Sequence, residues 1–402
     1  MCRKSLFKIV VLGMLSFIQT ACENAENDVI RNLVYINEAS TAKTKELTIQ
    51  EDVTRTSVTI RLAKAAKQDI KAELFMDEGL LENYNKKNET NYKMPKEEYV
   101  TFLKTVTIKA GEVSAEPVNI DIEEFETEGS QYAVPIGIKS VDGGLDKAEA
   151  SSGFMLVLVK PLRQLVPKFS WYNGMKAEPQ DEDWNISLSN YTLEWWSKVS
   201  NSRGGGYTKN NQAIFYSGSG GTELYVRFGD ELYGSGHYMF NFLQVKTMGT
   251  QFDSGDPVTG KGLEPNEWYH FAVTYDATTG TSLLYQNGAL IATLMTSVGT
   301  PMLINRFHMI SSGRSYFYDD CELCQVRLWK VTRSANQIRK NMYAEVEYTN
   351  KDLLLYYPMN EGDGATILHD VTGNGHDIEV GNMYPENANR TKVTWKSYLF
   401  AQ

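Results

Sequence analysis

The stretch Trp268-Tyr-His-Phe-Ala-Val-Thr-Tyr-Asp276 decides the fold of the C-terminal half of the chain. It is apolar and aromatic, as expected of a buried strand. The clearest hairpin of the sequence follows it, in Ser282-Leu-Leu-Tyr-Gln-Asn-Gly-Ala-Leu-Ile-Ala292. Asn287-Gly288 at the centre of the hairpin supplies the positive φ angles that a type I′ turn requires. Strand signals continue to the end of the chain, so this half is predicted to form two antiparallel sheets packed face to face.

One helix is predicted within this half. Ser334 can cap the amides of the first turn, and Gln337, three residues later, completes the pattern of a capping box. Ile338 and Met342 then give an apolar stripe at helical spacing. The fold class of the C-terminal domain is therefore all-β with a single capped helix.

The N-terminal part, residues 33–160, is predicted to form a separate β-sandwich. Tyr132–Ile138 is one strand, whose Pro135 must lie at a sheet edge or a bulge because proline lacks the backbone donor. A short helical insert is predicted near Asp77–Tyr84. About seven strands over this length favour an immunoglobulin-like sandwich. Three further segments alternate polar and apolar residues with the period of a strand: Ser57–Leu62, Lys104–Lys109 and Pro117–Ile122.

The first residues have the features of a secretory signal. Three basic residues precede an apolar run from Ile9 to Ile18, which is too short to cross a bilayer because a spanning helix needs roughly 20 apolar residues. Cys22 follows small residues, and the segment resembles a bacterial lipobox, which implies a diacylglycerol attached to this cysteine. Gln19 stands where leucine is usual, and a soluble secreted protein is the alternative.

An acidic tract after Cys22 is expected to be a flexible tether to the membrane surface. The predicted organisation is a signal peptide (1–21), a lipid-anchored tether (22–32), the N-terminal β-sandwich domain (33–160), a stiff proline-flanked linker (161–167) and the C-terminal domain (168–402).

Charge and cysteine content exclude some classes of protein. The formal net charge is −10, and it becomes −13 once the three basic residues of the signal are removed. Nucleic acid is therefore not an expected partner, because an acidic protein repels polyanions. Cys321 and Cys324 lie three residues apart in an apolar segment. If the segment is extended, the two side chains point to opposite faces, so we expect two buried thiols rather than a disulfide.

The C-terminal half resembles a laminin-G-like, or concanavalin A-like, jelly roll. Five segments in the right order carry the resemblance: Tyr191–Trp196, Arg227–Asp230, Trp268–Asp276 with Leu284–Gly288, Val326–Arg333 and Asp370–His376.

The first domain resembles an N-terminal domain of unknown function found in Bacteroidetes surface lipoproteins. In that family the domain precedes an endo-glycosidase barrel or a lectin-like sandwich, and the proteins are typically encoded with outer-membrane glycan importers. The resemblance therefore implies polysaccharide uptake, with an importer or a glycosidase as partner. The matching residues are Leu81–Asn85, Tyr92–Pro95, Tyr99, Ala110-Gly111 and Tyr132–Ile136.

Jelly rolls of this superfamily include glucanases, so a glycoside hydrolase is one alternative function. A retaining glycosidase needs two carboxylates about 5 Å apart. The sandwich glucanases supply them from a Glu-x-Asp-x-x-Glu strand pattern, which the second domain lacks. The acids of 178–183 lie before the first strand, and Asp319 and Asp320 are adjacent and point apart. The histidines are scattered, and His270 is expected to be structural. No catalytic residue is therefore predicted.

Carbohydrate binding needs exposed aromatic rings for the apolar faces of sugars and nearby polar groups for their hydroxyls. Trp171 and Tyr172, beside Asn173-Gly174, form one candidate site. Trp195 is another candidate, although core packing is the favoured interpretation for it and for Trp196. The tract richest in aromatic and polar residues is loop-like, and its candidate sugar-binding residues are Arg227, Asp230, Tyr233, His237 and Tyr238. The alternatives to sugar binding are a structural ion pair or turn formed by Arg227 and Asp230, and a core position for Tyr238.

Calcium is the metal that the laminin-G resemblance implies, and it prefers six or more oxygen ligands. Asp370 and Asn374, in a glycine-rich turn, could supply two of them. The same residues are also what a plain turn prefers, so a structural role is the alternative.

The sequence thus favours a non-catalytic, cell-surface lipoprotein of the outer membrane that binds a glycan. A structural or protein-docking lipoprotein that binds no sugar is the first alternative, and a jelly-roll glycoside hydrolase is the second.

Overall fold

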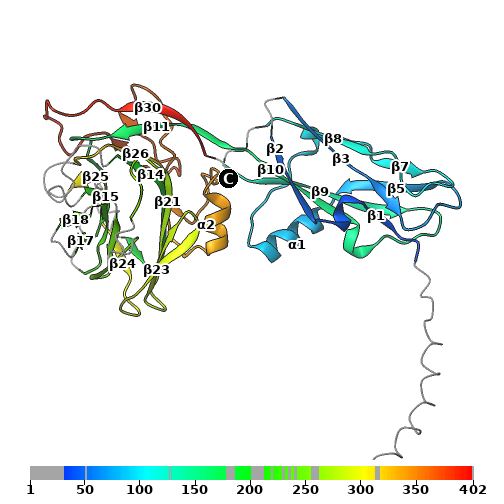
Figure 1. The fold of residues 1–402 in the computed structure, drawn as a ribbon, viewed down its shortest axis with the longest axis horizontal. Coiled ribbons are helices and arrows are strands. Elements are labelled where there is room, and N and C mark those ends of the chain that lie inside the picture. The colour runs from blue at the N-terminus through cyan, green and yellow to red at the C-terminus, as the bar shows by residue number, and fades with distance from the viewer. Residues whose placement is uncertain are drawn as a thin grey trace, which may run out of the picture.

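The computed structural model describes residues 31–49, 52–125, 127, 129–177, 186–200, 212–218, 221–228, 231–233, 237–239, 242–254, 262–312 and 317–400. Within these ranges the chain forms two β domains, and the helices α1 (Glu78–Asn88) and α2 (Ala335–Asn341) lie near the junction between them (Figure 1). No helix in this part of the chain is both long and apolar enough to span a bilayer. The predicted signal segment and Cys22 lie outside the described residues.

The N-terminal domain is a sandwich of short strands around one apolar core, with Ile60, Ile120 and Leu156 fully buried. The predicted β-sandwich is therefore confirmed. Its larger sheet has the order β2 (Thr44–Thr48), β10 (Gly153–Val159), β9 (Tyr132–Val141), β5 (Ile70–Met76) and β7 (Thr105–Ile108). The other strands are β3 (Val53–Val58), β8 (Val118–Glu123) and β6 (Val100–Phe102), with the pair β1 (Val34–Ile36) and β4 (Ile60–Leu62).

The predicted helical insert is α1. The Asp77 side chain accepts a hydrogen bond from the amide of Leu80 at 3.1 Å. This bond satisfies one of the amides left open at a helix start. Leu81 is the buried residue of the helix. The insert therefore begins where the sequence predicts and runs one turn further. Single 3₁₀ turns occur at Glu38–Ser40, Glu97–Tyr99 and Glu149–Ser151.

The expectation for Pro135 is wrong, because this proline lies in β9, an interior strand between β10 and β5. The strand β5 ends at Met76, which pairs with Ile136. The next residue, Asp77, donates its amide to the Pro135 carbonyl at 2.8 Å. Proline has no backbone N–H to donate to a neighbouring strand. No such bond to β5 is needed at Pro135, because β5 has already ended at Met76.

The C-terminal domain is the predicted two-sheet sandwich. One sheet has the order β23 (Ala289–Met295), β22 (Thr281–Gln286), β21 (Tyr269–Asp276), β14 (Asn190–Val199), β26 (Cys321–Trp329), β11 (Leu162–Phe169) and β30 (Thr394–Phe400), and β27 (Leu353–Tyr357) also pairs with β26. The six-stranded sheet has the order β12 (Met175–Ala177), β25 (Phe307–Ser312), β15 (Gln212–Ser217), β16 (Leu224–Phe228), β19 (Leu243–Thr247) and β20 (Thr250–Asp253).

Three strand pairs complete this domain. They are β13 (Ile186–Leu188) with β24 (Met302–Ile304), β17 (Glu231–Tyr233) with β18 (His237–Met239), and β28 (Ile367–Leu368) with β29 (Ile378–Glu379).

Local signals in the sequence are confirmed in this domain. Asn287 and Gly288 both have positive φ angles in the turn between β22 and β23. A type I′ turn requires this conformation at its two central residues. In α2 the Ser334 hydroxyl accepts from the amide of Gln337, and the Gln337 side chain accepts from the amide of Ser334. These two bonds complete the capping box.

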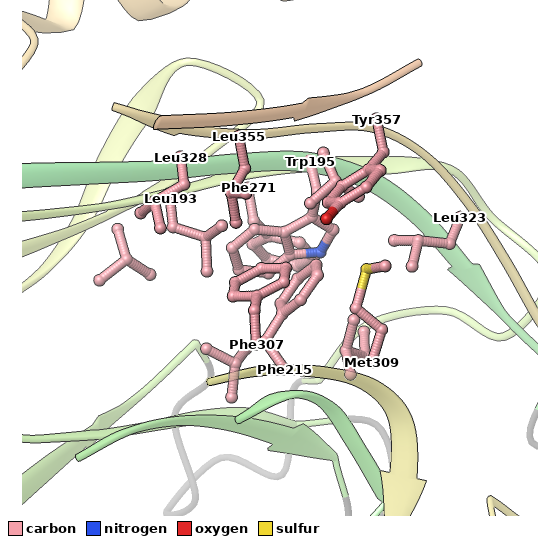
Figure 2. Close-up of a cluster of buried hydrophobic side chains, with 14 of the residues drawn as sticks. Leu193, Trp195, Phe215, Phe271, Phe307, Met309, Leu323, Leu328, Leu355 and Tyr357 are labelled. Carbon is pink, nitrogen blue, oxygen red and sulfur yellow. The ribbon is translucent and has the colours of Figure 1, made fainter. Parts of the chain in front are cut away.

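Aromatic side chains fill the space between the two sheets. Trp195 lies at the centre with its ring 4.9 Å from that of Phe215 and 5.5 Å from that of Phe271 (Figure 2). Phe307 stacks on Phe215 at 5.6 Å. Since all of these rings are fully buried, they hold the two sheets together rather than meet solvent.

The predicted linker over 161–167 is wrong. Residues 162–167 lie in β11, which pairs with β30 from Leu162 to Lys168 and reaches β26 at its end. Only Lys160 and Pro161 separate β10 of one domain from β11 of the other. The two prolines give the local sequence the appearance of a linker. In the structure, however, Pro167 lies within β11 and is paired with Trp395 of β30.

The two cysteines of β26 are free and buried. Cys321 is paired with Val199 and Cys324 with Trp196 on β14. Burial raises the pKa of both thiols well above its ordinary value. Neither is therefore a reactive thiolate.

Candidate functional site

The outer face of the six-stranded sheet carries the candidate site. In β16 the side chains of Leu224, Val226 and Phe228 are buried in the core. Because successive side chains of a strand point to opposite faces, Tyr225 and Arg227 lie on the outer face. Both are half-buried, so they line a surface without being fully exposed.

The neighbouring strands extend this outer face with rings and an amide. The Tyr216 ring on β15 lies 5.5 Å from the Tyr225 ring and 5.8 Å from the imidazole of His308 on β25. On β19, Gln244 accepts two hydrogen bonds from Arg227, at 2.8 Å from Nε and 2.5 Å from Nη2. The guanidinium also lies 4.9 Å from the centre of the Tyr225 ring.

We call this group of side chains the aromatic face: Tyr216, Tyr225, Arg227, Gln244 and His308. Half-buried rings beside a guanidinium can bind the C–H faces and the hydroxyls of a sugar. Gln244 is only 1% exposed and His308 9% exposed, so these two side chains hold Arg227 and Tyr216 in place rather than meet a ligand. The group is held rigidly, because the Arg227 fork is fixed on Gln244 and stacked on Tyr225. Only Arg227 was identified from the sequence. The other four could not be, because the pairing that brings β15, β16, β19 and β25 together is not visible in a local pattern.

The remaining residues of the predicted loop tract are placed only in part. Asp230 lies outside the described residues, so its alternative as an ion-pair partner of Arg227 stays a prediction. Tyr233, His237 and Tyr238 belong to the β17–β18 hairpin, where Tyr233 pairs with His237 and Leu232 with Tyr238 along the backbone. Their role in binding also stays a prediction.

Trp171 and Tyr172 lie in the turn between β11 and β12. The Trp171 indole nitrogen donates to the Tyr318 carbonyl at 2.8 Å, and the two rings stack at 5.6 Å. The Tyr172 ring contacts that of Tyr384 edge-on at 5.4 Å, and its backbone has a positive φ angle. Both side chains are half-buried, so a ligand could contact part of each, but they also tie the turn to neighbouring segments.

Trp195 is not a ligand platform. Its side chain has no exposed surface, and its indole nitrogen donates to the Ser197 hydroxyl at 3.1 Å inside the core. The carbohydrate-binding interpretation of Trp195 is therefore wrong, and core packing is correct. Trp196 is also buried on the other side of the same sheet, and its nitrogen donates to the Met342 carbonyl at 2.6 Å.

A buried charge cluster lies on the outer side of the eight-stranded sheet, beneath α2. Glu194, with no exposed surface, accepts from Arg333 Nη1 at 2.5 Å, and its second oxygen lies 3.8 Å from Arg327 Nη1. The imidazole of His270 is 3.9 Å from the same oxygen. Burial, together with Arg327 and Arg333, holds the pKa of His270 well below its ordinary value. The predicted structural role of His270 agrees with this setting.

The other acids considered for catalysis also have protein partners. Asp320 lies 3.4 Å from Lys168, and Glu322 lies 2.9 Å from Lys198. Together with the buried Glu194, they are held in ion pairs rather than open to a cleft. The acids of 178–183 lie outside the described residues.

The side chains of Asp370 and Asn374 tie their turn to the backbone of β27. Asp370 Oδ1 accepts from the Tyr356 amide at 3.1 Å and from the Thr372 hydroxyl at 2.8 Å. Burial raises the pKa of Asp370, but hydrogen bonds from His376 and Thr372 outweigh it and lower that pKa overall. Asn374 donates to the Leu354 carbonyl at 3.0 Å. Among the described residues there is no group of three or more His, Cys, Asp or Glu side chains that could hold a metal ion, and calcium binding stays a prediction.

Comparison with known families and structures identifies the fold. Residues 173–339 match the concanavalin A-like lectin/glucanases superfamily, and residues 28–145 match a family described as an N-terminal domain. The C-terminal domain is thus a concanavalin A-like jelly roll, which confirms the predicted fold class. No curated protein sequence matches the chain.

Three solved structures are similar to the chain. A Bacteroides ovatus protein, provisionally described as carbohydrate binding, is 21% identical, with a TM-score of 0.60 over 92% of this chain and 99% of its own. Bacteroides thetaiotamicron EndoBT-3987, solved with a Man5GlcNAc product, is 23% identical over 32% of this chain and 30% of its own, with a TM-score of 0.28. A pentraxin from Limulus polyphemus is 10% identical over 44% of this chain and 80% of its own, with a TM-score of 0.32.

Proposed function

We propose that this protein is a non-catalytic surface lipoprotein that binds carbohydrate on the aromatic face of its jelly roll. The observation that carries the proposal is the half-buried pair Tyr225 and Arg227, in which a ring and a guanidinium lie side by side and the buried amide of Gln244 holds the guanidinium in place. Such a set can stack on a sugar ring and at the same time hydrogen-bond its hydroxyls.

Two further observations support the ligand class. The domain has the fold of a superfamily named for lectins and glucanases. A Bacteroides ovatus protein of the same overall fold is provisionally described as carbohydrate binding. The acids at Glu194, Asp320 and Glu322 are held in ion pairs. Their pairing favours capture of a glycan over its hydrolysis, which needs two carboxylates facing the sugar.

The proposed location is the cell surface, with the chain anchored in the outer membrane through a lipid on Cys22. The signal-like start and the acidic tract after Cys22 support this location. The partners would be a glycan importer or a glycosidase of the same uptake system, beside which a tethered binding domain raises the local glycan concentration.

The test of sugar binding is a glycan array of plant and host polysaccharides probed with the chain from residue 23, followed by titration calorimetry. Tyr225→Ala and Arg227→Ala should each weaken binding about fivefold or more, because each removes a stacking or hydrogen-bonding group worth roughly 1 kcal/mol or more. Tyr225→Phe should keep most of the affinity. Arg339→Ala, an exposed arginine on α2, is the matched control. Unchanged affinity in both alanine variants would refute this site.

The test of the anchor is the fate of Cys22→Ser in the expressing cell. The native chain should fractionate with the outer membrane and carry labelled fatty acid, whereas the variant should lose both properties. A native chain found only in the soluble fraction would favour the secreted form instead. A reducing-end assay on any bound glycan tests the hydrolase alternative, which predicts release of new chain ends.

One observation favours the protein-docking alternative. Edge strand β23 exposes apolar side chains, with Leu290 52%, Ile291 40% and Met295 65% exposed. An apolar patch on a sheet edge is typical of a contact surface. If no polysaccharide binds and the double variant Leu290→Lys/Met295→Lys abolishes co-purification of a partner from the native membrane, docking is the function.

A further inference from the structure

A cavity of about 730 Å³ lies between the two domains. The N-terminal domain lines it with β2, Tyr84 of α1, Thr127 and residues 129–132, and the C-terminal domain lines it with Lys340, residues 343–345, Tyr348 and Phe400. The volume falls within the roughly 300–1,000 Å³ of sites that bind small molecules. Junctions between domains are also a preferred place for such sites.

Polar contacts across the junction fix the two walls. Lys93 Nζ lies 2.7 Å from Glu347 Oε1, and Gln131 donates to the side chain of Asn341 at 2.7 Å. At Gly129, whose φ angle is +73°, an added Cβ would overlap the carbonyl of Val346. The two backbones therefore approach as closely as glycine allows.

Tyrosine is the dominant aromatic residue of the lining. The Tyr84 and Tyr92 rings lie 6.1 Å apart at an angle of 45°. Neither hydroxyl makes a hydrogen bond to another side chain or backbone group among the described residues. Burial, with smaller effects of Tyr84 and Glu46, raises the pKa of Tyr92 to about 12. Its phenol therefore stays neutral and can donate or accept. Tyr132, Tyr343 and Tyr348 also line the cavity.

The charges of the described lining residues are mixed. They comprise two carboxylates, Glu46 and Glu345, and three cationic groups, Lys160, Arg163 and Lys340, so the lining carries a net charge of only +1. Burial lowers the pKa of Lys340, and the nearby positive charge of Arg339 lowers it further. The charged ammonium of Lys340 is therefore less stable at this wall than it would be in water. A strongly charged ligand would have to lose its hydration without a dominant counter-charge, which disfavours it. An uncharged ligand with many hydroxyls meets no such cost.

We propose that the interdomain cavity is a second carbohydrate site, which takes a short uncharged oligosaccharide or the end of a glycan chain. The tyrosine rings would pack on the C–H faces of the sugar, and the Tyr84 and Tyr92 hydroxyls would hydrogen-bond to it. The proposal rests on the proposed function for the ligand class, but its residues are separate from the aromatic face. Because both domains supply the walls, this site exists only in the two-domain protein.

The experiment is titration calorimetry of the chain from residue 23 with cellotriose, maltotriose, mannotriose, xylotriose and chitotriose. Tyr84→Phe/Tyr92→Phe keeps the rings and removes two hydroxyls, and it should weaken binding at one site about tenfold or more. Thr48→Trp, at an exposed position of β2 beside the cavity, should fill the space and abolish that binding. Tyr99→Phe and Thr101→Trp are the matched controls in the same domain.

The outcomes separate the two sites. Two binding events per chain, one lost in Thr48→Trp and the other in Arg227→Ala, support both proposals. Binding that survives in Arg227→Ala and is lost in Thr48→Trp supports the cavity site and refutes sugar binding at the aromatic face. Binding that is unchanged in both cavity variants and lost in Arg227→Ala overturns the cavity site and leaves the proposed function standing. No binding of any of the five sugars to the native chain overturns the cavity site as well.

Discussion

Glu194 is a carboxylate with no exposed surface, and Arg333 and Arg327 supply its counter-charges. Glu194→Ala should lower the free energy of unfolding of the C-terminal domain by about 3–5 kcal/mol, because it removes the carboxylate that pairs with two buried guanidinium groups. Urea unfolding followed by tryptophan fluorescence measures this domain selectively, since every tryptophan lies between residues 171 and 395.

The control for this change is Glu267→Ala, at an exposed position before β21. A surface substitution of this kind should alter stability by only about 0.5 kcal/mol or less. Equal unfolding midpoints for the two variants would show that the buried cluster contributes nothing.

His270, in the same cluster, should make stability depend on pH. Its pKa is well below 6.5 in the native state and near 6.5 in the unfolded chain. Below pH 6.5 the unfolded chain therefore binds a proton that the native state excludes. The stability is complete above about pH 6.5 and falls as the pH drops further, by at most about 1.4 kcal/mol per unit.

The measurement is the urea midpoint at pH 7.5 and at pH 5.5, for the native chain and for His270→Gln. The variant should lose less stability over this interval. A slope that is the same in both chains would mean that other groups carry the acid sensitivity.

At the scale of elements, α2 is short and depends on its cap. The Ser334 hydroxyl accepts from the amide of Gln337 and also lies 2.9 Å from Glu89 Oε2 across the junction. Ser334→Ala should cost about 0.5–2 kcal/mol in urea unfolding, and Ser334→Thr should recover most of it. If the alanine variant unfolds at the native midpoint, the capping box does not stabilise the helix.

Elements with a local signature were predictable from the sequence. The turn at Asn287-Gly288 and the capped helix after Ser334 follow from the backbone preferences of a few adjacent residues. Features that depend on a distant partner were not predictable. The sequence after Pro161 looks like a linker, and only its pairing with β30 shows that it is a strand. Pro135 fits in an interior strand only because β5 ends at Met76.

The candidate site was predictable only at Arg227, for the same reason. Tyr216, Gln244 and His308 reach it through strand pairings between segments far apart in the chain. Glu194 lies between an apolar residue and two tryptophans, and nothing local shows that Arg327 and Arg333 will surround it.

At the scale of the whole molecule, Gly129 controls how closely the domains approach. Gly129→Ala should push Val346 away and loosen the junction, because the new Cβ would overlap the Val346 carbonyl. The radius of gyration from X-ray scattering should rise, while the tryptophan-detected unfolding of the C-terminal domain should stay the same.

Gly144→Ala is the control for this change. Gly144 also has a positive φ angle, close to that of Gly129, but an added Cβ meets nothing within 4 Å. The control therefore reproduces only the backbone strain of a side chain in this conformation. The same radius of gyration in both variants would contradict a role of Gly129 in domain approach.

The parallel pairing of β2 with β10, from Thr44 opposite Met155 to Thr48 opposite Val159, has a mechanical consequence. β10 leads almost directly into the C-terminal domain, whereas β2 lies near the start of the chain. Tension between the N-terminus and the C-terminal domain would pull these two strands in opposite directions along their length. The ladder would then be loaded in shear, with its hydrogen bonds sharing the force rather than opening one after another like a zipper. The proposed lipid anchor at Cys22 and a polymer bound by the C-terminal domain would load the protein in this direction.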